Sequence, residues 1–164
     1  MAVQYFLLIS RQGKVRLSKW YQPTAVKEKA KIVRELSSII IARSTKSSNV
    51  IDYRGQRVVL RRYASLYFVA AISPEENELL ALETIHLFVE VLDKYFGNVC
   101  ELDLIFNFHK AYLLLDEVIL NGELQDTSKK AILKYVSLQE SVLNEASGRV
   151  GGGPSGVVAI NYDA

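Results

Sequence analysis

VIDYRGQRVVLRRYASLYFVAAIS, residues 50–73, is the stretch that decides the fold class of this chain. It is rich in β-branched and aromatic residues, and Gly55 offers a turn, so it predicts three short strands. Its apolar residues are too dense for a sheet that keeps one face in water. The stretch therefore predicts a group of hairpin-linked strands that is covered on both faces.

A second group of strands is predicted nearer the N-terminus. VQYFLLIS (3–10) and VRLSKWY (15–21) are joined by RQGK (11–14), in which Gly13 supplies the turn of a hairpin. Side chains alternate along a strand, so the second strand is expected to have two distinct faces. One face holds Val15, Leu17 and Tyr21, and the other holds Arg16, Ser18 and Trp20.

The connection between the two strand groups is predicted to be a helix. Pro23 ends the preceding strand and Thr24 is a suitable N-cap, so the helix is expected to run from there to about Arg43. Its buried face is expected to hold apolar and small residues at helical spacing. These residues are Val26, Ala30, Val33, Ser37 and Ile40.

After residue 73 the spacing of apolar residues changes to three and four, which predicts helices. Ser73-Pro74-Glu75-Glu76 has the pattern of a capping box with proline at the first helical position, and Gly97 is expected to end that helix. Helical structure is expected to start again at Asn98 and to stop at Gly122. Asp126 or Thr127 then predicts the cap of a last helix that runs to about Glu145.

The predicted element order is ββ-α-βββ-α-α-α, with strands in hairpin-linked groups. This order favours an α+β fold, an antiparallel sheet with helices on both faces, over a doubly wound parallel sheet. Residues 1–146 are predicted to form one domain. Residues 147–164 hold five of the nine glycines and are predicted to be a disordered tail.

Composition excludes several classes of function. The net charge of +2 gives no drive toward nucleic acid, and no apolar run reaches the ~20 residues that a membrane-spanning helix needs. A single cysteine rules out an internal disulfide and fits a reducing, cytosolic setting. Hydrophobic residues make up 49% of the chain, which indicates that partner subunits cover part of its surface.

The reactive residues form no recognisable site. His86, Cys100 and His109 match no zinc-ligand spacing, so no metal and no cofactor are expected. Cys100 has no base indicated for it and is expected to be a small buried thiol. The sequence also lacks phosphate-binding glycine loops and nucleophile elbows. The chain is therefore not expected to be an enzyme.

Two features leave alternatives open on residue patterns alone. The basic residues that flank the first hairpin suit either an ordinary charged surface or a small acceptor for an acidic side chain: Arg11, Lys14, Arg16 and Lys19. An apolar run suits either core alone, or core on one side and a groove or subunit interface on the other. It comprises Val99, Leu102, Leu104, Ile105, Phe106 and Phe108.

Four long motifs carry a resemblance to a known family. They are SRQGKVRLSKWY (10–21), RRYASLYF (61–68), ETIHLFVEVLDKYFGNVCELDLIFNFHKAYLLLDE (83–117) and GELQDTSKK (122–130). With them the chain resembles the small sigma subunits of clathrin adaptor complexes. SRQGK and FNFHKAY are more similar to the complex-1 sigma chain of the trans-Golgi network and endosomes than to the plasma-membrane type. The resemblance implies a longin-like fold, a five-stranded antiparallel sheet with the first helix on one face and the later helices on the other.

The resemblance also implies partners and a place of action. The partners would be two large chains (gamma and beta-1), a medium chain (mu-1), cargo tails, and clathrin indirectly through the large chains. The chain would act on the cytoplasmic face of trans-Golgi, endosomal and coated-vesicle membranes, which it would reach only through the complex. The alternatives are the sigma chain of another adaptor type, another longin-type trafficking module such as a coatomer small chain or a longin SNARE, and a small enzyme that uses Cys100.

Within the family, the sigma chain receives acidic dileucine signals, [D/E]xxxL[L/I], from cargo tails. By resemblance, Arg16 would lie near the acidic residue of the signal, with a basic residue of a large chain completing that site. The leucine pockets would be formed by Ala64, Leu66, Val89, Asn98, Val99, Leu102 and Leu104.

Overall fold

The computed structural model describes residues 2–120, 122–124, 133–134, 137–138, 140–142 and 144–145. Its strands are β1 (Val3–Ser10), β2 (Val15–Trp20), β3 (Val50–Tyr53), β4 (Gln56–Tyr63), β5 (Leu66–Ile72), β6 (Ile119–Leu120) and β7 (Glu123–Leu124). Its helices are α1 (Val26–Ala42), α2 (Glu78–Phe96), α3 (Glu101–Phe106) and α4 (Phe108–Val118). The strand groups at 3–21 and 50–73 are therefore confirmed.

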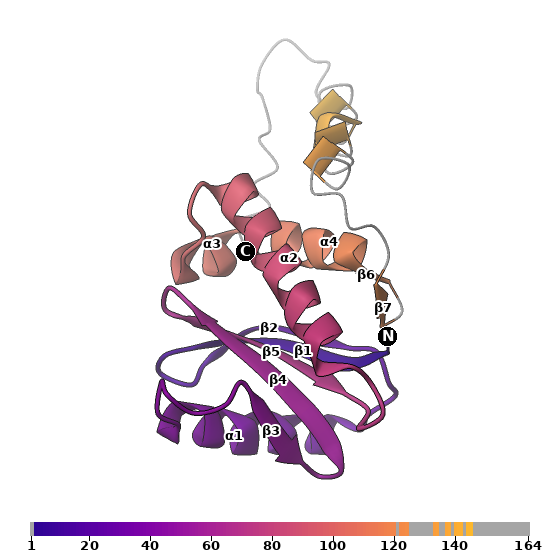
Figure 1. Cartoon of the computed structure of the whole chain (residues 1–164). Coiled ribbons are helices and arrows are strands. Elements are labelled where there is room, and N and C mark those ends of the chain that lie inside the picture. The colour runs from indigo at the N-terminus through magenta and orange to yellow at the C-terminus, as the bar shows by residue number, and fades with distance from the viewer. Residues whose placement is uncertain are drawn as a thin grey trace.

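The five long strands form one antiparallel sheet in the order β2-β1-β5-β4-β3. Helix α1 covers one face of this sheet, whereas α2, α3 and α4 lie on the other (Figure 1). The short β6–β7 hairpin adjoins the start of β1, where the Val3 N–H donates to the carbonyl of Gly122 over 2.7 Å. The predicted α+β fold, longin-like with helices on both faces, is confirmed.

Strand β1 shows why both faces must be covered, because every one of its residues is buried. Phe6 and Leu8 join a core cluster on the α2 side, and Leu7 and Ile9 join a second cluster on the α1 side. Phe88 of α2 meets the ring of Phe6 edge to face, with 5.4 Å between ring centroids. A central strand that is apolar in both directions can only be stable between two layers.

Helix α1 begins later than predicted, and its buried face is different. Ala25 is its N-cap, so Thr24 lies one residue before the cap, and the Thr24 hydroxyl donates to the carbonyl of Gln22. The prediction that Val26 and Ala30 face the core is wrong, since both are exposed. The buried residues are Ile32, Leu36, Ser37 and Ile40. Two overlapping sets of residues on α1 have helical spacing. The set with the larger side chains is buried, because it removes more apolar area from water.

The predicted start of the second long helix is also wrong. The backbone of Ser73–Glu76 forms a turn, and α2 begins at Glu78, where the side chain of Asn77 accepts a hydrogen bond from the Leu79 N–H over 2.9 Å. The Ser73 hydroxyl is bonded to the Gln4 side chain instead of capping a helix. The predicted end at Gly97 is confirmed, with φ of +64° at that glycine.

The helix predicted from Asn98 to Gly122 is wrong as one element, because it is divided at Asn107 into α3 and α4 and ends before β6. In the region of the last predicted helix, residues 133–134, 137–138, 140–142 and 144–145 are helical. Its predicted caps, Asp126 and Thr127, and the predicted tail 147–164 lie outside the described residues.

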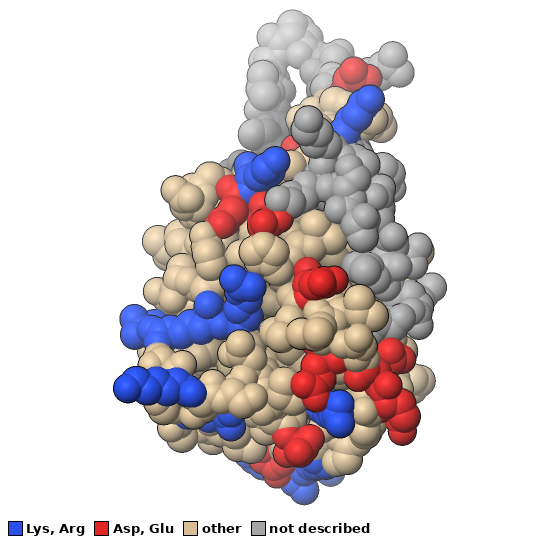
Figure 2. Space-filling view, viewed as in Figure 1, with Lys and Arg blue, Asp and Glu red and all other residues tan. Residues whose placement is uncertain are grey.

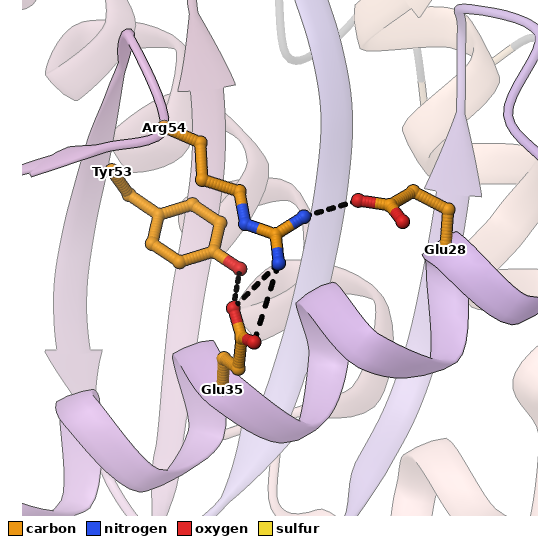
Figure 3. Close-up of polar contacts among 4 residues, drawn as sticks. All are labelled: Glu28, Glu35, Tyr53 and Arg54. Atoms are coloured by element: carbon orange, nitrogen blue, oxygen red, sulfur yellow. Dashed lines mark hydrogen bonds and ion pairs between the residues drawn. The ribbon is translucent and has the colours of Figure 1, made fainter.

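A polar cluster fastens α1 to the β3–β4 hairpin (Figure 3). Arg54, in the turn at φ of +50°, pairs with Glu28 and with Glu35, whose Oε2 lies 3.0 Å from Arg54 Nη2. The Tyr53 hydroxyl also donates to Glu35. Burial, followed by this hydrogen bond, raises the pKa of Tyr53 to about 12, and the same hydrogen bond is the main cause that lowers the pKa of Glu35. The cluster links the helix and the hairpin on the face away from α2.

Candidate functional site

The end of α2 is connected to its surroundings through Asp93. The Asp93 Oδ1 accepts a hydrogen bond from the Val99 N–H over 2.9 Å, and Oδ2 accepts one from the Tyr63 hydroxyl. This carboxylate therefore joins the end of β4 to the turn at Gly97 and Asn98, both of which have positive φ. The hydrogen bond to Asp93 is the main cause that raises the pKa of Tyr63.

Sequence reasoning missed Asp93, although a signal was present. An acidic residue in the last turn of a helix opposes the helix dipole, so it is expected there only when another interaction compensates. Asp93 is in that position in α2, and its compensation comes from the two groups that it holds. The residue positions the segment that leads into α3.

Four of the seven residues expected to form the leucine pockets come together in one core cluster. They belong to β5, α2, the loop before α3, and α3 itself, and each is 3% exposed or less: Leu66, Val89, Val99 and Leu104. The other three are exposed. Ala64 is in the β4–β5 turn at φ of +52°, Asn98 follows the end of α2, and Leu102 on α3 is 59% exposed. The expected site thus has a buried apolar floor and an exposed rim.

Arg16 reaches this region because of a β-bulge. Leu8 pairs with Leu17 and Ile9 pairs with Val15, so Arg16 is the extra residue on β2. A bulge redirects side chains, and the predicted alternation is wrong here, because Val15 packs on the α1 side and Leu17 on the α2 side. The Arg16 side chain extends to α3, where its Nε and Nη2 each lie 2.8 Å from Oε1 of Glu101.

Helix α4 covers the outer edge of the sheet beside this pair. The Tyr112 hydroxyl donates to the Ser18 carbonyl over 2.9 Å and accepts from the Ser18 N–H over 3.0 Å. Lys19 forms an ion pair with Asp116 at 3.2 Å. An edge strand has unpaired backbone groups, and Tyr112 satisfies two of them on β2. No local sequence pattern pointed to Tyr112, since its partner is far away along the chain.

Helix α3 has one buried side and one exposed apolar side. Leu104 is buried, whereas Leu102, Ile105 and Phe106 are exposed. This agrees with the alternative in which the apolar run is core on one side and a groove or interface on the other. Figure 2 shows one face of the molecule on which Lys and Arg gather toward the left edge and Asp and Glu toward the lower right, with mostly uncharged residues between them.

The residues first suspected of reactivity have ordinary surroundings. The prediction of a buried thiol is wrong, because Cys100 is exposed at the N-cap of α3, where its backbone N–H donates to Asp103. His86 pairs with Glu90 one turn away, and His109 stacks on Phe108. Among the described residues, no three His, Cys, Asp or Glu side chains are grouped to hold a metal ion. No helix in the described part of the chain has the length and apolar character to cross a membrane.

Residues 2–143, which include the whole site, match the family model "Clathrin adaptor complex small chain". The chain belongs to the clathrin adaptor small-chain family. This small chain is 56% identical to AP-1 complex subunit sigma-2 of Arabidopsis thaliana over 144 residues. The alignment covers 88% of this chain and 89% of the relative. It is 54% identical over 143 residues to AP-1 complex subunit sigma-1A of Homo sapiens, with 87% and 90% covered.

A further relative is AP-1 complex subunit sigma-1 of Schizosaccharomyces pombe, 57% identical over 136 residues, with 83% of this small chain and 84% of the relative covered. Among structures, a chain of the "Homology model of the full-length AP-3 complex in a stretched open conformation" matches with a TM-score of 0.70 and 24% identity, and covers 90% of this small chain and 98% of that chain. The structural match shows a shared fold. The predicted resemblance is confirmed, as is the prediction that the small chain is not an enzyme.

Proposed function

We propose that this small chain is the sigma subunit of an AP-1-type adaptor complex that binds acidic dileucine signals in cargo tails and works in transport between the trans-Golgi network and endosomes. The relatives at 54–57% identity are named as AP-1 sigma subunits, which supports the complex type. The alternative of a small enzyme that uses Cys100 has no support from the family match, which is to adaptor small chains.

One observation carries the proposal for cargo binding. The Arg16 guanidinium lies 2.8 Å from Glu101, and Glu101 directly precedes the exposed Leu102 on α3. An arginine, paired with Glu101, and an apolar surface are thus adjacent, although they come from β2 and α3, which are far apart in the sequence. An acidic dileucine signal also has a carboxylate and two apolar side chains within a few residues. The site and the signal therefore have complementary chemistry.

The energetics suit a reversible sorting interaction. Complete burial of one leucine side chain is worth ~1.5–3 kcal/mol. Two such burials, less the cost of ordering a flexible tail, leave weak binding. An exposed ion pair at Arg16 adds ~0–1 kcal/mol. Many complexes on one membrane would then retain cargo by multivalency and still release it when the coat disassembles.

Other exposed apolar side chains support the assignment of partner subunits. They occur on α1, at the start of α2 and on α3, and they include Ile41, Leu79, Leu80, Ile105 and Phe106. Obligate interfaces are large and apolar. We assign these surfaces to the large chains (gamma and beta-1) and the medium chain (mu-1), and clathrin and membrane to contacts made by the complex. Co-purification from cells tests this: gamma- and beta-1-type chains support it, and large chains of another adaptor type or coatomer contradict it.

Cargo binding is tested with a reconstituted heterotetramer and a fluorescent ExxxLL peptide. Leu102→Ser is the sharpest substitution, because Leu102 is 59% exposed and its loss leaves the core intact. Val99 is nearly fully buried, so a charge there would damage the fold as well. We expect Leu102→Ser to weaken binding about fivefold, which corresponds to ~1 kcal/mol of lost apolar contact.

The matched control is Leu120→Ser, at a similarly exposed leucine in β6, outside the surfaces assigned to the partner chains. It should leave peptide affinity unchanged, and both variants should assemble normally. Unchanged affinity in Leu102→Ser would refute the placement of the leucine pockets. Equal weakening by both substitutions would mean that the loss is not specific to α3.

A further inference from the structure

Arg16, the residue expected to receive the acid of a cargo signal, is already paired with an acid of its own chain. Its Nε and Nη2 both lie 2.8 Å from the same oxygen, Oε1 of Glu101. The two side chains are 26% and 24% exposed, so the pair is within reach of solvent and of a ligand. Within the part of the chain that the structure describes, Glu101 is the carboxylate that pairs with Arg16.

We propose that Glu101 is a specificity-determining residue that occupies Arg16 and competes with the acidic residue of an incoming cargo signal. The inference rests on the proposed cargo function and concerns how much the acidic residue of the signal contributes to binding affinity. Glu101 imitates the ligand from inside the chain: it is a carboxylate on the residue next to Leu102, as the acid of the signal is close in sequence to its leucines.

Electrostatics explain why the competition matters. The pair has no net charge, so an approaching carboxylate is not attracted as it would be by a free guanidinium. A second carboxylate that comes within ~4–6 Å of Glu101 also experiences like-charge repulsion. The cargo acid therefore gains from Arg16 only by displacing Glu101, and its net contribution is the difference between two similar ion pairs.

The displacement is inexpensive, which keeps the site usable. Partly exposed ion pairs contribute little net stability, and the freed Glu101 carboxylate can be hydrated because its side chain is partly exposed. The leucines then provide most of the affinity, and the acid shifts it by a small factor. A site of this kind discriminates against neutral signals only weakly when it acts alone.

The same strand offers a matched control. Lys19 pairs with Asp116 of α4 at 3.2 Å, in the same way that Arg16 pairs with Glu101 of α3. Asp116→Asn and Glu101→Gln each remove one negative charge from a helix that packs beside β2, so they change the net charge of the chain equally. Asp116 is outside the set of residues assigned to the leucine pockets.

The experiment measures peptide affinity in the reconstituted heterotetramer by fluorescence anisotropy, with the native chain, Glu101→Gln and Asp116→Asn. The peptides are ExxxLL, QxxxLL and ExxxSS, at moderate salt. We expect Glu101→Gln to tighten ExxxLL about two- to fivefold, as the loss of a competing exposed ion pair implies, and to leave QxxxLL unchanged. Asp116→Asn should leave the ratio of the two affinities unchanged.

The outcomes separate this inference from the proposed function. If the native complex binds ExxxLL no better than ExxxSS, the cargo function itself is wrong. If the native complex binds ExxxLL but Glu101→Gln does not increase the preference for ExxxLL over QxxxLL, measured as the ratio of their affinities, Glu101 does not compete for Arg16. Equal tightening of both LL peptides also overturns the inference, because the effect of Glu101 would then not depend on the acid of the signal.

Discussion

Removal of one hydroxyl group, in Tyr112→Phe, tests how α4 is fixed to the edge of the sheet. The Tyr112 hydroxyl bonds both the N–H and the carbonyl of Ser18, over 3.0 and 2.9 Å. A hydrogen bond contributes ~0.5–1.5 kcal/mol net, and a buried backbone group left without a partner costs ~1–3 kcal/mol. Both residues are half-buried, so water can partly replace the hydroxyl. We expect a loss of ~1–3 kcal/mol in the free energy of unfolding.

The assay is urea unfolding of the full chain, in which a loss of this size lowers the midpoint by about 1 M. Amide hydrogen exchange gives a local readout, because the Ser18 N–H should lose protection while the amides of β5 in the middle of the sheet keep theirs. Ser18→Ala is the control: Tyr112 bonds the backbone of Ser18, so this substitution should leave both hydrogen bonds and the stability unchanged. Unaltered protection of Ser18 in Tyr112→Phe would refute the reasoning.

Two further predictions concern stability. Gly122→Ala should lower the urea midpoint of the full chain by an amount that corresponds to ~1–3 kcal/mol. Gly122 has φ of +84°, and a Cβ there would lie 2.7 Å from the Val3 carbonyl oxygen. An unchanged midpoint would contradict the contact between β1 and this turn. Glu35 has a pKa lowered in the folded state, chiefly by its hydrogen bond from Tyr53, so its stabilisation is present above the unfolded pKa near 4.5 and is lost as the pH falls through the folded pKa. Urea unfolding between pH 3 and 7 should therefore show that Glu35→Gln loses less free energy of unfolding than the native chain does below about pH 4.5. An equally steep loss in the two proteins would contradict this role of Glu35.

Local patterns were sufficient for the strands and for one helix end. The hairpin-linked strands follow from β-branched density and turn residues, and Arg54 and Gly55 form a turn in which both have positive φ. Gly97 ends α2 because a left-handed C-cap favours glycine. The family resemblance came from long motifs and is independent of these patterns.

Predictions failed where two local solutions were equally good. The Ser73 motif fits a helix cap, but in the structure the Ser73 hydroxyl bonds Gln4 and α2 begins at Glu78. The expected stripe on α1 has the correct period, yet packing selects Ile32 and Leu36 instead of Val26. In both cases the deciding contact comes from a segment far away in the sequence, which a local window does not contain.

The element types, the antiparallel α+β class and the family resemblance could be predicted from local sequence, because they depend on periodicity, turn residues and contiguous motifs. The candidate site instead depends on tertiary contacts. A bulge in β2 turns Arg16 toward α3, the Asp93 carboxylate accepts a hydrogen bond from the Val99 N–H, and Glu101 pairs with the Arg16 guanidinium. Each of these depends on the register of a strand or the placement of a helix end, which are settled by long-range packing and hydrogen bonding and not by the residues on either side.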